Sequence, residues 1–221
     1  MFIPLVQSEE TVVIISRMEG EQVDELVKNC VHACIVLSQD RQPIKKADLY
    51  RLVFQKTNYR VASAIIQQAN RDLNDIFGMR IYELDDKSKY LLVNSSPDHF
   101  DFGSYSDSMC TELTVLFFVL IDIFASPDEK MMEEDIENTL KGMDLTSSEL
   151  KTTLETLVKK LYLTQEKRQD SRLFSWGPRA VAEVDPESFF KRFLFLVGDT
   201  SDKDWPELRK RIDKLKSIAK R

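Results

Sequence analysis

The 221-residue chain contains only three cysteines, six glycines and seven prolines. Three cysteines cannot form a disulfide framework in a chain of this length, so we expect a reducing compartment. So few glycines and prolines exclude a collagen-like repeat, a Gly-rich linker protein and most all-β folds. Hydrophobic residues make up 43% and charged residues 31% of the chain, which is ordinary for a folded protein and excludes a disordered one.

The chain also lacks a hydrophobic run long enough to cross a membrane. Its longest apolar segment, residues 113–124, covers about two thirds of the ~20 residues that a membrane-spanning helix needs. Asp122 interrupts this segment. We therefore expect a buried helix there and no membrane contact.

A large excess of positive charge is absent too, because the formal net charge is −6. This value argues against a constitutively basic nucleic-acid-binding protein. The charge is uneven, however. Residues 41–60 carry six Lys and Arg against one Asp, residues 203–221 carry eight against three acids, and residues 122–149 carry nine Asp and Glu against two Lys. Such separation favours charged partners that are steered to one face.

The hydrophobic pattern predicts two copies of one structural unit. In residues 21–96, three helices with apolar residues at three- and four-residue steps precede two short strands around a turn at 85–88. After a linker rich in Ser, Pro and Asp at 97–108, residues 109–200 repeat that order without obvious sequence identity. Three helices followed by a β-hairpin is the order of a winged helix, a variant of the helix-turn-helix.

We therefore predict a mainly α-helical α+β fold with small β-hairpins, built from tandem winged-helix domains. An N-terminal arm, residues 1–20, precedes the two units, and a basic helix within 201–221 follows them. The predicted helices lie at about 23–37, through 49–53 and at 61–77 in the first unit, and at 109–125, 131–141, 146–161 and 186–197 in the second. Gly78 is the expected cap after the third helix, and Ser147 and Ser148 are candidate caps of the helix at 146–161. The predicted strands lie at 79–84 and 90–94, and at 162–164 and 173–176 around a polar turn at 165–171.

No catalytic or metal-binding motif is present in the sequence. It contains neither a phosphate-binding glycine loop nor a G-x-S-x-G or H-E-x-x-H motif, and His32 and His99 are far apart. Cys30 and Cys34 share a helix face, but they coincide with the apolar stripe, and His32 points away from them. Buried core thiols are therefore favoured over a zinc site. We expect neither enzymatic activity nor a cofactor.

The basic segment around the second helix is a candidate DNA-contact site. Asp48 is the only acid in this segment, and the predicted fold often binds DNA. Weak and salt-sensitive contact with phosphates is therefore one interpretation. A solvated helix face is the other. The third helix presents side chains of mixed sign, which argues against base-specific recognition. The candidate DNA-binding residues are Lys45, Lys46, Arg51, Lys56 and Arg60.

The aromatic segment at 189–197 is apolar over more than one helix face. One complete apolar stripe consists of Phe190, Phe193, Leu194 and Val197. Phe189, Phe195 and Leu196 are then surplus apolar side chains. Two interpretations remain: a helix buried on two sides, or a pocket wall that accepts a partner's helix.

Residues 175–183 carry the most specific motif of the chain, Ser-Trp-Gly-Pro-Arg-Ala-Val-Ala-Glu. Gly177 turns the chain out of the hairpin, Pro178 pre-sets φ for a helical start, and Trp176 fills the seam between them. The Trp-Gly-Pro-Arg run, which ends at Arg179 and is followed by a Glu four residues later, resembles the signature of the MAGE homology domain. That domain is itself a tandem winged helix.

Two further stretches are similar to the same family. Pro-Ile-Lys-Lys-Ala-Asp-Leu at 43–49 resembles the entry to its second helix, and Asp-Trp-Pro at 204–206 resembles the tail of its chromosomal member. The resemblance spans about residues 23–213. It is strongest to the branch that serves as a non-SMC subunit of the structural-maintenance-of-chromosomes (SMC) complex devoted to DNA repair.

This resemblance implies a nuclear, non-enzymatic scaffold that binds a RING-type ubiquitin ligase subunit and a kleisin subunit. It further implies that the protein promotes ubiquitin ligation and contributes to double-stranded DNA binding. In the family a Leu-Leu pair on the first helix engages the RING partner, and Cys34 and Ile35 stand at that place here. The candidate kleisin contacts are Phe190, Phe193 and Leu194.

The middle of the second unit departs from the family pattern. The family's Phe-Gly-Asp-Pro segment is replaced by Gly-Met-Asp-Leu at 142–145, so we expect a partner groove of different shape. The alternative function is a stand-alone winged-helix DNA-binding transcriptional regulator. The acidic net charge, the surplus apolar helix and the lack of a clean basic recognition helix favour the scaffold.

Overall fold

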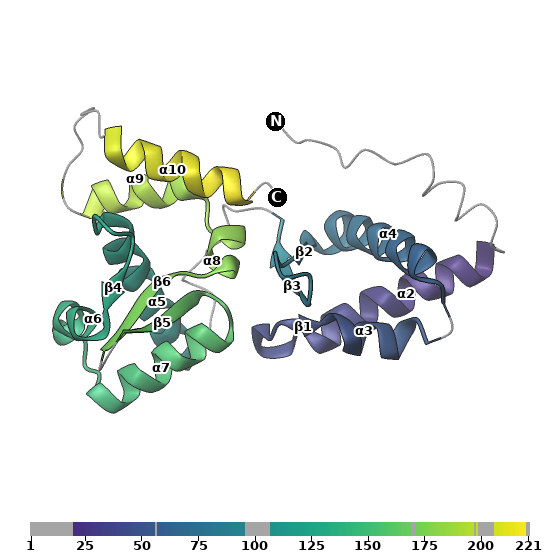
Figure 1. Ribbon diagram of the computed structural model, residues 1–221, viewed down its shortest axis with the longest axis horizontal. Coiled ribbons are helices and arrows are strands. Elements are labelled where there is room, and N and C mark those ends of the chain that lie inside the picture. Colours follow the sequence, from purple (N-terminus) through teal and green to yellow (C-terminus); the bar gives the residue numbers. More distant parts are fainter. Residues whose placement is uncertain are drawn as a thin grey trace. The chain divides into compact units, whose positions relative to one another are not determined.

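Two units, divided between Ser95 and Ser96, make up the fold. Among the described residues each unit contains helices and one three-stranded antiparallel sheet (Figure 1), which confirms the predicted α+β class. The predicted N-terminal arm up to residue 19 and most of the linker lie outside the described residues. The computed structural model describes residues 20–55, 57–95, 107–168, 171–196, 198 and 206–219.

The first unit contains a helix, a short strand, two more helices and a hairpin. The strand order in its sheet is β1-β3-β2, so the first strand pairs with the far strand of the hairpin. This order of elements and strands is that of a winged helix. The bounds are α2 (Gly20–Leu37), η1 (Gln39–Arg41), β1 (Ile44–Lys45), α3 (Lys46–Val53), α4 (Tyr59–Phe77), β2 (Met79–Glu83) and β3 (Lys89–Asn94).

Local sequence signals place both ends of α4. Asn58 accepts a hydrogen bond from the Arg60 backbone N–H at 3.0 Å and so caps the first turn. Gly78 ends the helix in the left-handed conformation (φ 61°), and its N–H bonds to the carbonyl of Asn74 at 3.1 Å. The predicted glycine cap is therefore confirmed.

The second unit repeats this order and adds three helices after its hairpin. Its strand order is β4-β6-β5, which matches the order in the first unit. The bounds are α5 (Asp107–Ala125), β4 (Met131–Met132), α6 (Glu133–Thr139), η3 (Leu140–Gly142), α7 (Ser147–Lys159), β5 (Leu163–Arg168), β6 (Ser171–Trp176), α8 (Pro178–Glu183), α9 (Pro186–Leu196) and α10 (Pro206–Ala219).

The predicted cap of α7 is wrong by one residue. Thr146, rather than Ser147 or Ser148, is the N-cap. The Thr146 hydroxyl accepts a bond from the Glu149 N–H at 3.3 Å, and the Glu149 carboxylate accepts one from the Thr146 N–H at 2.9 Å. This reciprocal capping box satisfies two backbone donors, which a serine further along the chain could not do.

The predicted polar turn at 165–171 is also wrong, because most of it is strand. β5 and β6 pair from Leu163↔Trp176 out to Arg168↔Ser171. The outer half of this hairpin extends beyond the core, so its residues are polar on both faces and show no alternation. The antiparallel hydrogen-bond ladder, rather than a buried apolar face, defines the strands there.

Helix α10 packs as part of the second unit. Ile212 is buried in the same core as α5 and α7, and Arg211 donates hydrogen bonds to the carbonyls of Phe124 and Pro127. Lys216 forms an ion pair with Glu187 on α9 at 2.6 Å. In Figure 1, α10 (yellow) runs alongside α9. Much of the basic charge of this helix is therefore bound within the unit.

Candidate functional site

The α9 helix is held by an aromatic cluster that joins it to α5 and the end of β6. Phe189 is only 6% exposed, and its ring packs edge-on against Phe117, Phe124 and Trp176 at centroid distances of 5.5, 6.4 and 5.3 Å. The interpretation of Phe189 as a surplus side chain is therefore wrong. It is the most buried phenylalanine of this helix, because α5 supplies a ring wall that the sequence of α9 does not reveal.

The Trp-Gly-Pro-Arg signature fastens this cluster to the hairpin. The Trp176 indole Nε1 donates to the Leu120 carbonyl at 3.1 Å, and Pro178 stands in the first turn of α8. Gly177 lies directly against the chain that enters β5, since a Cβ on it would lie 2.3 Å from the Leu161 carbonyl oxygen. Its role is therefore close backbone approach.

Substituting Gly177 with Ala is expected to destabilise the second unit by about 1–3 kcal/mol or more, because the added methyl group overlaps backbone that cannot rotate away. Gly142→Ala is the matched control, since a Cβ at Gly142 meets nothing within 4 Å. Thermal unfolding followed by circular dichroism measures both. Equal melting temperatures for the two variants would contradict the close-approach role.

Arg179, the last residue of the signature, is fully buried. Its Nε donates to the Lys160 carbonyl at 2.9 Å, and its Nη1 forms an ion pair with Glu183 at 3.0 Å. The Tyr162 hydroxyl donates to the other Glu183 oxygen at 2.6 Å. The hydrogen bonds to Lys160 and from Tyr162 tie α8 to the segment between α7 and β5, so the signature is a structural element rather than a ligand site.

The predicted kleisin contacts lie beside this cluster. The rings of Phe190 and Phe193 stack at 6.4 Å, and both pack partly against the core. Leu194 is half-buried. Val197, the last member of the predicted stripe, lies outside the described residues. The structure therefore brings three of the predicted contacts together on one helix, with part of their apolar surface exposed.

Phe195 is 76% exposed, in contrast to Phe189 on the same helix. With Phe117 on α5 and the two cations Lys191 and Arg192, it lines an open groove of about 380 Å³. Sequence reasoning noted Phe195 as surplus but missed the groove, because the opposite wall comes from a helix about 80 residues earlier in the chain. An aromatic groove with basic rims suits a peptide helix that carries apolar and acidic side chains.

The predicted RING contact on α2 divides into a core residue and a surface residue. Cys34 is 0% exposed and Ile35 is 38% exposed. A hydrogen bond with Cys34, together with burial, raises the pKa of the Cys30 thiol and keeps it protonated. The interpretation of both cysteines as core thiols is confirmed. The prediction of direct contact by Cys34 is corrected, and the exposed apolar pair at this place is Ile35 with Val36.

The predicted DNA-binding residues are less available than their sequence suggests. Lys46 forms an ion pair with Glu83 at 2.9 Å and lies near the rings of Tyr59 and Tyr90. Burial alone would lower the pKa of Lys46, but hydrogen bonds with Glu83 and Tyr90 outweigh burial and raise it. Burial raises the pKa of Tyr90 to about 12. Lys46 therefore acts mainly in holding α3 to the hairpin.

The other candidate cations of the first unit differ in their surroundings. Arg51 pairs with Asp48 at 3.2 Å on the surface of α3. Lys45 and Arg60 are exposed. Lys56 lies outside the described residues. This surface therefore keeps a modest positive charge, which is consistent with weak contact only.

The described residues contain neither a metal centre nor a membrane-spanning helix. No group of three or more His, Cys, Asp and Glu side chains there converges as a metal site. None of the helices described is both long and apolar enough to span a membrane.

Similarity to known sequences shows the family of the chain. The MAGE homology domain profile matches residues 30–187, which is more than half of the chain. The chain belongs to the MAGE homology domain family. The Trp-Gly-Pro-Arg signature lies inside the matched span, whereas most of α9 and all of α10 lie beyond it. The groove on α9 is thus mostly outside the part that the family profile describes.

The relatives of this MAGE homology domain include two human proteins. Melanoma-associated antigen B10 is 29% identical over 196 residues, which cover 83% of this chain and 56% of the relative. The non-structural maintenance of chromosomes element 3 homolog is 24% identical over 200 residues, which cover 84% of this chain and 65% of the relative. The chain therefore spans between half and two thirds of the length of these two relatives.

A solved structure matches the fold of this MAGE homology domain. A chain of the Nse1-Nse3-Nse4 complex superimposes with a TM-score of 0.72 and 23% sequence identity, and the match covers 90% of this chain and 100% of that chain. At this identity the likeness shows the fold. It confirms the predicted tandem α+β architecture.

Proposed function

We propose that this MAGE homology domain is a non-enzymatic scaffold subunit of an SMC-type chromosome complex in the nucleus, acting in DNA repair. It binds a RING-type ubiquitin ligase subunit and a kleisin subunit, promotes ubiquitin ligation and contributes to double-stranded DNA binding. Similarity to the human non-structural maintenance of chromosomes element 3 homolog and the fold shared with a chain of the Nse1-Nse3-Nse4 complex support this role. The structural observation that carries it is the apolar groove on α9.

The kleisin subunit docks on α9 in this proposal. Phe195 offers an exposed ring and Phe117 a partly buried one, and Phe190, Phe193 and Leu194 add partly exposed apolar area on α9. Removing such surface from water contributes about 25 cal/mol per Å² before the cost of association. Lys191 and Arg192 at the rim favour a kleisin helix with acidic flanks.

The RING-type subunit docks on α2 through Ile35 and Val36, whereas Cys34 lies in the core of the first unit. These two side chains are neighbouring, exposed and aliphatic, on a helix whose opposite face is fixed in the core. An exposed aliphatic pair on a rigid helix is a suitable anchor for a partner. The RING subunit is held in a fixed position on the scaffold, which is how a non-enzymatic protein promotes ubiquitin ligation.

Co-expression with RING and kleisin subunits tests the scaffold. We expect the three proteins to co-purify and the RING subunit to transfer ubiquitin faster in the complex than alone. Ile35→Asp with Val36→Asp should abolish RING co-purification while the melting temperature stays within a few degrees of the wild type. Leu52→Asp, on an exposed aliphatic side chain of α3 in the same unit, is the matched control. Failure to co-purify with either partner would favour the stand-alone DNA-binding regulator.

A further inference from the structure

We propose that Ser171, at the tip of the β5–β6 hairpin, is a phosphorylation site for a serine/threonine kinase that selects basic substrates. Arg168, on the opposite strand, then holds the phosphate. This site is independent of the proposed function, because it involves neither partner subunit. It depends on the spacing of the cations before Ser171, on the exposure of the hairpin tip and on the pairing of Ser171 with Arg168.

Two basic residues stand shortly before Ser171 in the sequence. Lys167 and Arg168 precede it by four and three residues. A kinase with an acidic substrate groove binds cations at such positions by charge complementarity, and a guanidinium can pair with both oxygens of one carboxylate. Both side chains are exposed, and within the described residues no hydrogen bond or ion pair engages either of them. Both cations are therefore available to a kinase.

The hairpin tip presents Ser171 in a form that a kinase can bind. Ser171 is the first residue of β6, so its backbone is already extended, and it lies beyond the segment that pairs with β4. Its hydroxyl donates to the Arg168 carbonyl at 3.0 Å in an exposed position. In the reaction the Ser171 oxygen attacks the γ-phosphorus of ATP, the bond to ADP breaks, and the hydroxyl proton passes to a carboxylate of the kinase.

Another serine has the same spacing from an arginine but lies in a helix. Arg60 precedes Ser63 by three residues. Ser63 is half-buried in α4, and its neighbours Ala62 and Ala64 belong to the buried face of that helix. The core fixes this part of α4 as a helix, so it cannot become extended in a kinase groove without unfolding. One spacing therefore gives an accessible acceptor in the hairpin and an inaccessible one in α4.

Ser171 and Arg168 lie on the same face of the hairpin. They are directly opposed in the antiparallel register, and such residues have Cβ atoms about 4.5–5.5 Å apart. Another directly opposed pair of this hairpin, Thr164 and Ser175, shows the expected proximity, since its hydroxyl oxygens are 2.6 Å apart. A phosphate on Ser171 is thus within reach of the Arg168 guanidinium, which can donate two parallel hydrogen bonds to phosphate oxygens.

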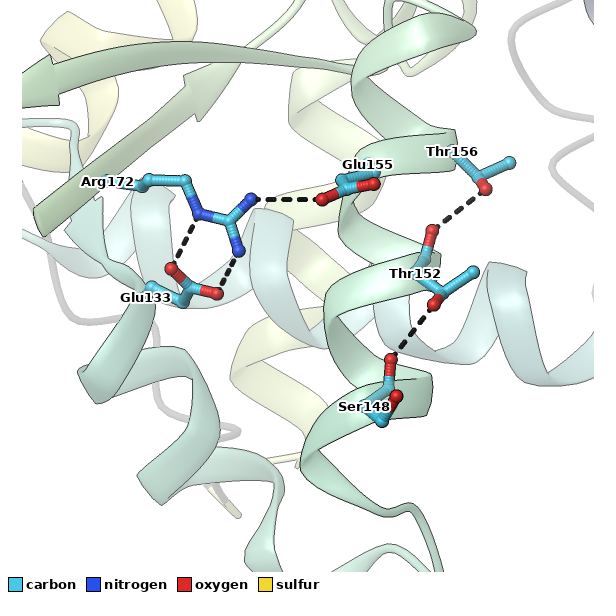
Figure 2. A network of polar contacts seen from close by, with 6 residues as sticks. All are labelled: Glu133, Ser148, Thr152, Glu155, Thr156 and Arg172. Carbon is cyan, nitrogen blue, oxygen red and sulfur yellow. Dashed lines mark hydrogen bonds and ion pairs between the residues drawn. The ribbon is translucent and has the colours of Figure 1, made fainter.

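Arg172, the residue after Ser171, is bound on the other face of the strand. Figure 2 shows its guanidinium between Glu133 and Glu155. Its Nε donates to Glu133 Oε2 at 2.6 Å, and its Nη1 contacts Glu155 Oε1 at 3.4 Å. Arg172 also precedes Ser175 by three residues, but these carboxylates already occupy it. Arg168 is therefore the arginine of this hairpin that is available both to a kinase and to the phosphate.

Phosphorylation would reverse the charge of the hairpin tip. Lys167 and Arg168 contribute two positive charges to this stretch of sequence, and Asp170 contributes one negative charge. A phosphoserine adds about −1.5 to −2 at neutral pH, so the net charge of the tip changes from about +1 to about −1. A reversal of sign on an exposed hairpin is a change that a charged partner can detect.

Treatment of the 221-residue chain with MgATP and the catalytic subunit of cAMP-dependent protein kinase tests the acceptor. Intact-mass spectrometry measures the phosphate per chain, and peptide mapping locates it. We expect incorporation at Ser171, which Ser171→Ala abolishes. Arg168→Gln should lower the initial rate by roughly ten-fold, because it removes a charge-assisted pair with the kinase. Arg60→Gln, which removes the cation at the same spacing from Ser63, is the matched control and should leave the rate unchanged.

Phosphorus NMR tests whether Arg168 holds the phosphate. The second ionisation of a phosphoserine has a pKa of about 6. A neighbouring guanidinium lowers this pKa, because it favours the doubly charged phosphate. We expect a lower phosphate pKa in the folded phosphoprotein than in the same protein unfolded in urea. Arg168→Gln, phosphorylated to completion by longer incubation, should lose this difference.

Each measurement can overturn the proposal. Phosphate found mainly on another serine, or no incorporation into the folded wild-type chain, would remove Ser171 as the acceptor, and this mapping needs no substitution. Equal initial rates for the wild type and Arg168→Gln would remove the role of the cation spacing. A phosphate pKa that is the same in the folded and unfolded protein would show that Arg168 does not hold the phosphate.

Discussion

Arg179→Met is expected to lower the free energy of unfolding of the second unit by about 3–5 kcal/mol, because it leaves the Glu183 carboxylate buried without its countercharge. Arg179 is fully buried and Glu183 nearly so. After the substitution the Tyr162 hydroxyl still donates to Glu183, but a neutral donor does not replace a cation. Urea unfolding followed by circular dichroism measures the loss.

A double-mutant cycle separates the unpaired charge from lost packing. Arg179→Met combined with Glu183→Leu removes both charges, so we expect the double variant to be more stable than Arg179→Met alone. If the free-energy losses of the two single variants simply add up in the double variant, the ion pair contributes no coupling energy. If Arg179→Met lowers the free energy of unfolding by less than about 1 kcal/mol, the Glu183 carboxylate is not left buried without a countercharge, and the prediction is wrong.

Phe189→Ala and Phe195→Ala are expected to have opposite consequences. Truncating Phe189 should destabilise the second unit by about 3–5 kcal/mol, because it opens a cavity among the rings of Phe117, Phe124 and Trp176. Truncating exposed Phe195 should change stability by at most about 0.5 kcal/mol, yet weaken kleisin binding by removing one wall of the groove. Thermal melting and kleisin titration on the same preparations measure both quantities.

Kleisin binding by Phe190→Ala and Phe193→Ala shows which side of α9 the kleisin contacts. At least one of them should weaken kleisin binding while the protein melts almost normally. Full-strength kleisin binding by all three variants, Phe190→Ala, Phe193→Ala and Phe195→Ala, would place the docking site elsewhere. Weakened binding in Phe193→Ala with normal binding in Phe195→Ala would locate the kleisin on the stacked Phe190–Phe193 pair instead of the groove.

Much of the architecture could be read directly from the hydrophobic periodicity. The three-helix-and-hairpin order of both units, the Gly78 end of α4 and the buried pair Cys30 and Cys34 depend on residues close together in sequence. The strands β1 and β4 could not be found that way. Each is two residues long and becomes a strand only by pairing with β3 or β6.

The sequence alone determined the fold class, the repeated unit and the family signature, because helix period and turn residues act over a few positions. Only the tertiary structure decided which side of α9 is buried, since α9 is apolar over several faces and α5 supplies the opposing rings. It also decided which charges remain available. Lys46 pairs with Glu83, which is 37 residues away in sequence, and Arg172 pairs with Glu133, which is 39 residues away. Lys167 and Arg168, by contrast, stay exposed. Ion pairing depends on distances in space, and the spacing of residues along the chain does not encode them.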